Sequence, residues 1–114
     1  MIEALWSVSF QSNAQLGSMG GTGVVVFETG RVFGGDSIMI YTGKYRVVND
    51  VIEADIHVDT FAIQPGMASI VGLPTFDLKV TGPVAHDRVV LSGHVVQDPN
   101  RKMTIVAIRR AELP

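Results

Sequence analysis

Apolar and polar residues alternate with a period of two along most of this chain. The clearest case is Ile52-Glu53-Ala54-Asp55-Ile56-His57-Val58-Asp59, in which the alternation is unbroken. Neighbouring side chains of a strand point to opposite faces, so this pattern predicts a strand with one buried and one solvated face. No stretch has a convincing helical period. Seven further segments are predicted strands: residues 5–11, 23–28, 31–34, 38–48, 76–81, 89–96 and 103–110.

Short turn signals separate most of these segments. They are Thr29-Gly30, Asn49-Asp50, Gly82-Pro83 and Asp98-Pro99-Asn100. Short connections imply antiparallel neighbours, and closing a meander removes its two exposed edges. We therefore expect an all-β fold, a closed antiparallel barrel of about eight strands that forms one domain over residues 1–114. A two-sheet sandwich is the alternative.

Two longer connections interrupt the alternation. Residues 17–23 are rich in glycine, and residues 60–75 contain two prolines and two glycines. A connection of the second length is usually functional or packs as a cap. If the chain has a helix, we expect one short helix in residues 60–75, and residues 67–71 fit either one helical turn or a short strand.

Composition excludes several classes of protein. The chain has no cysteine, so disulfides and thiolate metal sites are absent. Its net charge is −2 with scattered basic residues, which gives no footprint for nucleic acid or an anionic membrane. The N-terminus lacks the basic and long apolar regions of a signal peptide, and no apolar run approaches a membrane span. We expect a cytoplasmic protein.

The segment Gly34-Gly35-Asp36-Ser37 is similar to the nucleophile motif of a hydrolase family. That chemistry needs a histidine base supported by an acid, and the Asp-x-x-His of those hydrolases is missing here. We interpret Gly34, Gly35 and Asp36 as a structural turn or surface motif. One glycine is expected to adopt positive φ or form a bulge, and Asp36 to accept backbone N–H bonds across the turn.

Other candidate chemistry is weaker. Asp55, His57 and Asp59 share a strand face, and two of them could bind a metal together with His94, but such a row is more often solvated. The glycine-rich residues 17–23 precede a valine-rich strand, whereas a phosphate-binding loop precedes a helix. We therefore expect no enzyme activity, no cofactor and no metal.

Five features in order resemble the GrlR-like family, whose founding members are negative regulators of type III secretion gene expression in bacteria. They are Leu5-Trp6-Ser7-Val8-Ser9-Phe10, the glycine-rich loop, the valine-rich strand, Gly34-Gly35-Asp36 and Tyr41-Thr42-Gly43. The resemblance implies a calycin-like barrel, similar to small lipocalins, that dimerises and binds a transcriptional activator. The founding regulators carry an acidic run where this chain has only Val48-Asn49-Asp50-Val51.

We therefore consider two alternative functions. The first is a regulator that binds a protein partner. The second is a carrier that holds an apolar small molecule in the barrel lumen, in contact with Trp6, Phe10, Tyr41 and Tyr45.

Several strands are apolar on both faces, and one small barrel can bury only one face of each. We therefore expect a homodimer. The C-terminal strand is the best candidate for its interface, with the dimer face formed by Met103, Ile105, Val106 and Ile108.

Overall fold

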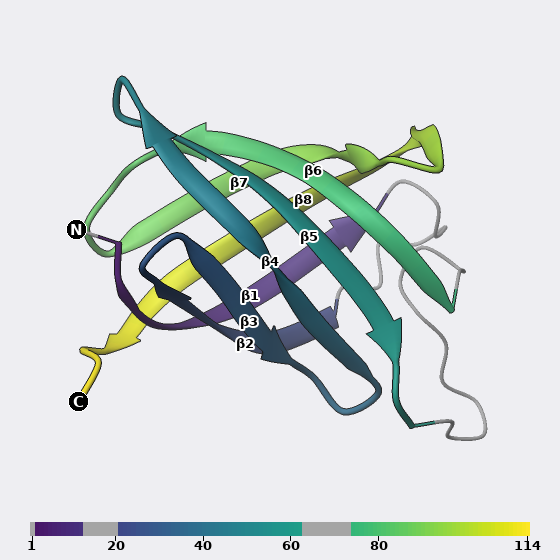
Figure 1. Ribbon diagram of the computed structural model, residues 1–114, viewed down its shortest axis with the longest axis horizontal. Helices are drawn as coiled ribbons and strands as arrows, with labels where there is room; N and C mark the ends of the chain where they lie inside the picture. Colours follow the sequence, from purple (N-terminus) through teal and green to yellow (C-terminus); the bar gives the residue numbers. More distant parts are fainter. Residues whose placement is uncertain (1, 13–20, 63–73) are drawn as a thin grey trace.

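The computed structural model describes residues 2–12, 21–62 and 74–114, and these form a closed antiparallel β-barrel (Figure 1). Each strand pairs with its neighbours in sequence, and β1 also pairs with β8, which closes the sheet. The all-β barrel is therefore confirmed, and the sandwich alternative is wrong. The strands are β1 (Ala4–Ser12), β2 (Gly21–Glu28), β3 (Arg31–Gly35), β4 (Met39–Val48), β5 (Val51–Thr60), β6 (Thr75–Pro83), β7 (Arg88–Val95) and β8 (Asp98–Ala111).

Two of the predicted turns are confirmed as two-residue hairpin turns. Thr29 and Gly30 have φ values of 49° and 78°, and Asn49 and Asp50 have φ values of 52° and 63°. Positive φ at both central positions is typical of the turn whose twist matches that of the flanking strands. These turns join β2 to β3 and β4 to β5.

The turn predicted at Asp98-Pro99-Asn100 is wrong. The chain reverses at residues 96–97, and β8 begins at Asp98. Val95 pairs with Asp98 but His94 pairs with Lys102, so residues 99–101 form an insertion in β8. Proline has no N–H for a regular ladder and is tolerated at such an irregularity. The turn predicted at Gly82-Pro83 also lies inside a strand, at the end of β6.

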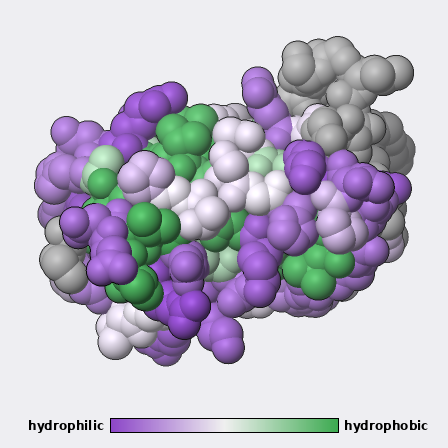
Figure 2. Space-filling view, turned by 90° about the horizontal axis from the view of Figure 1, so that it is seen from above, coloured by the Kyte–Doolittle hydropathy of each residue, from purple (hydrophilic) through white to green (hydrophobic). Residues whose placement is uncertain are grey.

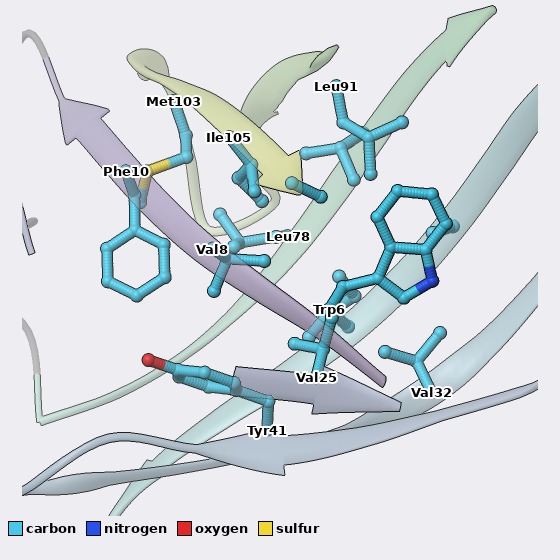
Figure 3. Packing of buried hydrophobic residues seen from close by; sticks show 14 of the residues in the cluster. Trp6, Val8, Phe10, Val25, Val32, Tyr41, Leu78, Leu91, Met103 and Ile105 are labelled. Carbon is cyan, nitrogen blue, oxygen red and sulfur yellow. The ribbon is translucent and has the colours of Figure 1, made fainter. Parts of the chain in front are cut away.

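The period of two decides which side chains fill the barrel. Along β5, Ile52, Ala54, Ile56 and Val58 are buried and the residues between them are exposed. All eight strands contribute buried apolar side chains to one continuous core (Figure 3). The largest fully buried side chains are Trp6, Phe76, Ile52, Leu91, Val32, Val80, Val89 and Val95.

The helix expected in residues 60–75 falls mostly on residues 63–73, outside the described part of the chain, as do residues 17–20 of the glycine-rich loop. In the described ranges, no helix is long and apolar enough to cross a membrane.

Candidate functional site

Asp36 organises the connection between β3 and β4. Its Oδ1 accepts hydrogen bonds from the backbone N–H of Ile38 at 2.9 Å and of Met39 at 2.7 Å. Its own N–H donates to the Met39 carbonyl at 3.0 Å, and its Oδ2 accepts from the Tyr41 hydroxyl. The expectation that Asp36 accepts backbone N–H bonds across the turn is confirmed. The Asp36 carboxylate stabilises the turn and binds the Tyr41 hydroxyl, so its role is structural.

The expected backbone conformation of Gly34 and Gly35 is wrong. Neither residue has positive φ, and the pairing of β2 with β3 continues through both without a bulge. The reason for glycine is close approach: a Cβ on Gly34 would lie 2.0 Å from the Val24 carbonyl oxygen. A Cβ on Gly35 would lie 2.7 Å from the Met39 carbonyl oxygen. The two glycines let neighbouring strands pass close to this segment.

Tyr41 connects this turn to the barrel interior. Burial, together with the hydrogen bond to the Asp36 carboxylate and its negative charge, raises the pKa of Tyr41 well above its usual value. The Tyr41 ring meets the Phe10 ring edge to face, with centroids 5.8 Å apart. Tyr41 is therefore a neutral, inward-facing residue.

The four predicted lumen residues belong to two separate aromatic groups. Trp6, Phe10 and Tyr41 are buried and Tyr45 is half-buried. Phe10 pairs with Tyr41, whereas Trp6 meets Phe27 at 6.2 Å and Phe27 meets Tyr45 at 5.2 Å, both edge to face. Figure 3 shows Phe10 beside Tyr41 and away from Trp6. Phe27, which joins Trp6 to Tyr45, was not among the predicted residues.

The sequence did not identify Arg109 as a residue of the barrel interior. In the structure its side chain is only 9% exposed. The guanidinium carbon lies 5.0 Å from the centroid of a Trp6 ring, and Nε donates to the His86 carbonyl at 2.7 Å. Arg109 Nη1 donates a hydrogen bond to Glu112 Oε1 at 3.1 Å. A register shift between Leu5 and Trp6 brings Arg109 opposite Trp6. An arginine at the end of an apolar strand carries no local signal of this contact.

The predicted dimer face mixes two sides of β8. Met103 and Ile105 point inward and are 3% and 7% exposed, so they belong to the core. Val106 and Ile108 point outward and are half-buried. Met103 and Ile105 are removed from the predicted face, because alternate residues of a strand point to opposite sides.

Exposed apolar side chains gather on the outside of β2, β3, β4 and the residues after β5. We call this group the outer apolar face; its exposed members are Val24, Phe33, Ile40 and Phe61. Gly35 lies between Val24 and Ile40 on the neighbouring strands and pairs with both. Because glycine has no side chain, nothing separates the side chains of Val24 and Ile40 across β3. Ser7 pairs with Val24 on one side and Ile108 on the other, which extends the surface towards β8. Half-buried neighbours on these strands are Leu5, Val26, Val106 and Ile108.

The outer surface of β5 and β6 has the opposite character. The outward residues 53, 55, 57 and 59 of β5 and 75, 77, 79 and 81 of β6 are all polar. In the face seen from above in Figure 2, hydrophobic side chains form separate areas between hydrophilic ones. The apolar surface of the barrel is therefore unevenly distributed.

The polar row on β5 is a solvated face, as expected. Asp55, His57 and Asp59 are exposed, and His57 Nδ1 lies 2.8 Å from Asp77 Oδ1 on β6. Hydrogen bonds from His57 and then from Gln97 lower the pKa of Asp77. Within residues 2–12, 21–62 and 74–114, no group of three histidines or carboxylates could hold a metal.

Fold and surface together define a closed eight-stranded antiparallel barrel with an apolar outer face on one side. No protein-family model and no curated protein sequence matches the chain. Its similarity to the GrlR-like family stays a prediction from the sequence.

Proposed function

We propose that this protein is a non-enzymatic, cytoplasmic regulator that binds a protein partner on its outer apolar face. The observation that carries the proposal is the gathering of Val24, Phe33, Ile40 and Phe61 on one side of the barrel, opposite in character to the polar β5–β6 surface. Contiguous exposed apolar patches mark interaction sites in soluble proteins.

The resemblance to the GrlR-like family suggests the kind of partner. In that family the barrel binds a transcriptional activator, so we propose an activator that this barrel sequesters. Phe33, which is 41% exposed, is the natural anchor, because aromatic side chains at the centre of an interface contribute most to binding. Leu5 and Val26 support it from neighbouring strands, since Val26 pairs with both Leu5 and Phe33.

The test is a pull-down with tagged protein from the native host, at low and at high salt. The wild type is expected to recover one transcription factor at both salt concentrations, because an apolar contact depends little on rim charges. Phe33→Glu is expected to lose it, since a charge would then be buried without a partner. Val96→Glu is the matched control: Val96 is 48% exposed and stands outside the outer apolar face.

Equal recovery by wild type and Phe33→Glu would contradict the docking surface. Recovery of no protein, with a hydrophobic small molecule extracted from the purified barrel, would favour the carrier. That molecule would lie against Trp6, Phe10, Tyr41 or Tyr45, which are the aromatic residues predicted to line the lumen.

A further inference from the structure

Two exposed arginines lie at the border of the outer apolar face, beside Ile108. Arg88 on β7 pairs with Ile108, and Arg110 lies two residues after Ile108 on β8. Ile108 pairs in turn with Ser7 on β1, and Ser7 pairs with Val24 on β2. The two arginines are therefore at the β7–β8 end of the row that contains this exposed valine.

The Arg110 side chain is held on the outside of the barrel by Ser7. Its Nε donates a hydrogen bond to Ser7 Oγ at 2.8 Å. The register shift between Leu5 and Trp6 makes Arg110 the extra residue of β8, which has no paired residue on β1. Its guanidinium is therefore fixed next to the apolar row by a side-chain contact, and its terminal N–H groups are left for another acceptor.

The positive charge of these two arginines is not balanced within the described part of the chain. Neither Arg88 nor Arg110 forms an ion pair there. The carboxylates nearest in sequence have other partners, since Asp87 contacts the adjacent histidine and Glu112 accepts from Arg109. The two arginines are diagonal neighbours across the β7–β8 pair, where long side chains of like charge repel. A carboxylate bound between them would relieve this repulsion, because a guanidinium binds a carboxylate through two parallel hydrogen bonds.

The sheet under this surface favours a helix as the bound segment. Strands β8, β1, β2 and β3 are each paired on both sides, so they offer no edge to an added strand. An extended segment lying across them would place unpaired backbone N–H and C=O groups against apolar side chains, which is costly. A helix satisfies these groups itself and presents an apolar stripe. From Arg110 on β8 to Phe33 on β3 the surface crosses three strand spacings, about 14 Å, which is the length of about ten helical residues.

We propose that the partner docks an amphipathic helix whose apolar stripe covers the outer apolar face and whose carboxylates, at one end, bind Arg88 and Arg110. This inference rests on the proposed function, because it takes the same face as the docking surface and adds the chemistry of the bound segment. The apolar contact supplies most of the affinity, and the arginines select an acidic segment and set its direction. A nucleic acid fits less well, because its phosphates need several clustered cations and here an apolar row begins beside two.

A display library of amphipathic helical peptides tests the charge selection. All members share one leucine stripe, and the residues at both ends are randomised. The wild type is expected to enrich peptides with Asp or Glu at one end, and the double variant Arg88→Glu/Arg110→Glu to enrich Lys or Arg there. Lys79→Glu is the matched control, because Lys79 is an exposed cation on the polar β5–β6 surface, and it is expected to keep the acidic preference. Circular dichroism checks that each variant keeps the fold.

Fluorescence anisotropy then compares the selected acidic peptide with the same peptide carrying lysines at that end. The ratio of the two Kd values is expected to change about tenfold or more between the wild type and the double variant, because attraction at the arginines becomes repulsion. Enriched peptides without an acidic end, or an acidic preference that the double variant keeps, would overturn this inference; loss of their binding in Phe33→Glu would show that the docking face itself stands.

Other outcomes separate this inference from the proposed function and from other occupants. Peptides that bind Phe33→Glu as well as the wild type would overturn the docking face, and this inference with it. A wild type that binds phosphatidylglycerol vesicles through Arg88 and Arg110 would identify a lipid surface as the occupant. Self-association that the double charge reversal abolishes would identify a second copy. Either result would overturn the acidic helix.

Discussion

Glycine serves two physically different purposes at single positions of this chain. Gly30 has φ of 78° in a tight turn, and the nearest atom to a Cβ there is the Tyr45 carbonyl oxygen at 3.7 Å. Gly34 has no such φ, but its missing Cβ makes room for the Val24 carbonyl oxygen. The first position needs backbone freedom and the second needs space.

We therefore expect Gly34→Ala to destabilise the barrel more than Gly30→Ala. Alanine at position 30 meets only the left-handed backbone penalty, about 1–2 kcal/mol. Alanine at position 34 forces β2 and β3 apart, and because the clash is with backbone we expect a cost at the upper end of the range for overpacking, which is about 1–3 kcal/mol. Urea unfolding followed by tryptophan fluorescence measures both changes. A larger loss for Gly30→Ala would show that backbone conformation, and not strand approach, limits this segment.

At the level of elements, strand β5 shows how completely an alternating segment determines its own orientation. Ile56 is 6% exposed. Its neighbour Asp55 is exposed, and Asp55 Oδ1 lies 3.6 Å from Lys79 Nζ. Turn residues predict the ends of strands less reliably. Pro99 belongs to β8, because an insertion opposite β7 accommodates it.

The two faces of β5 should differ sharply on truncation. Ile56→Ala is expected to lower the free energy of unfolding by about 2–5 kcal/mol, because it removes buried contacts and leaves a cavity. Asp55→Ala is expected to cost about 0.5 kcal/mol or less, since exposed ion pairs contribute little. Chemical denaturation of the two variants side by side is the measurement. Equal losses would mean that Ile56 is not part of the cooperative core.

At the scale of the whole molecule, the barrel should be sensitive to alkaline pH through its tyrosines. Burial raises the pKa of both Tyr41 and Tyr45, and Asp36 raises that of Tyr41 further. In the unfolded chain a tyrosine ionises at a pKa of about 10. The folded state therefore holds these protons more tightly, so their contribution to stability is intact below pH of about 10 and falls as pH rises above it.

Spectrophotometric titration at alkaline pH tests this expectation. In the native protein, tyrosine ionisation is expected to start at higher pH than in urea and to coincide with loss of the β-sheet signal. Tyr41→Phe, which keeps the ring and removes the ionising group, is expected to make the alkaline unfolding less steep. Ionisation of both tyrosines near pH of about 10 with an intact barrel would contradict the burial of Tyr41.

Much of this protein is determined by its sequence alone. The alternation of apolar and polar residues predicts the strands and their buried faces, and Thr29-Gly30 and Asn49-Asp50 predict two hairpin turns. The short connections predict antiparallel pairing of consecutive strands. These features follow from interactions between residues close in sequence, so a local pattern is sufficient to predict them.

Other features were decided by the tertiary structure. The stacking of Arg109 on Trp6 and the close approach at Gly34 both depend on how far one strand slides past the next. That register is a property of the whole closed sheet, because strand lengths, stagger and an irregularity in one pair change the position of every later neighbour. The sequence predicts which residues point outward, and the closed barrel decides which of them meet and which remain uncovered.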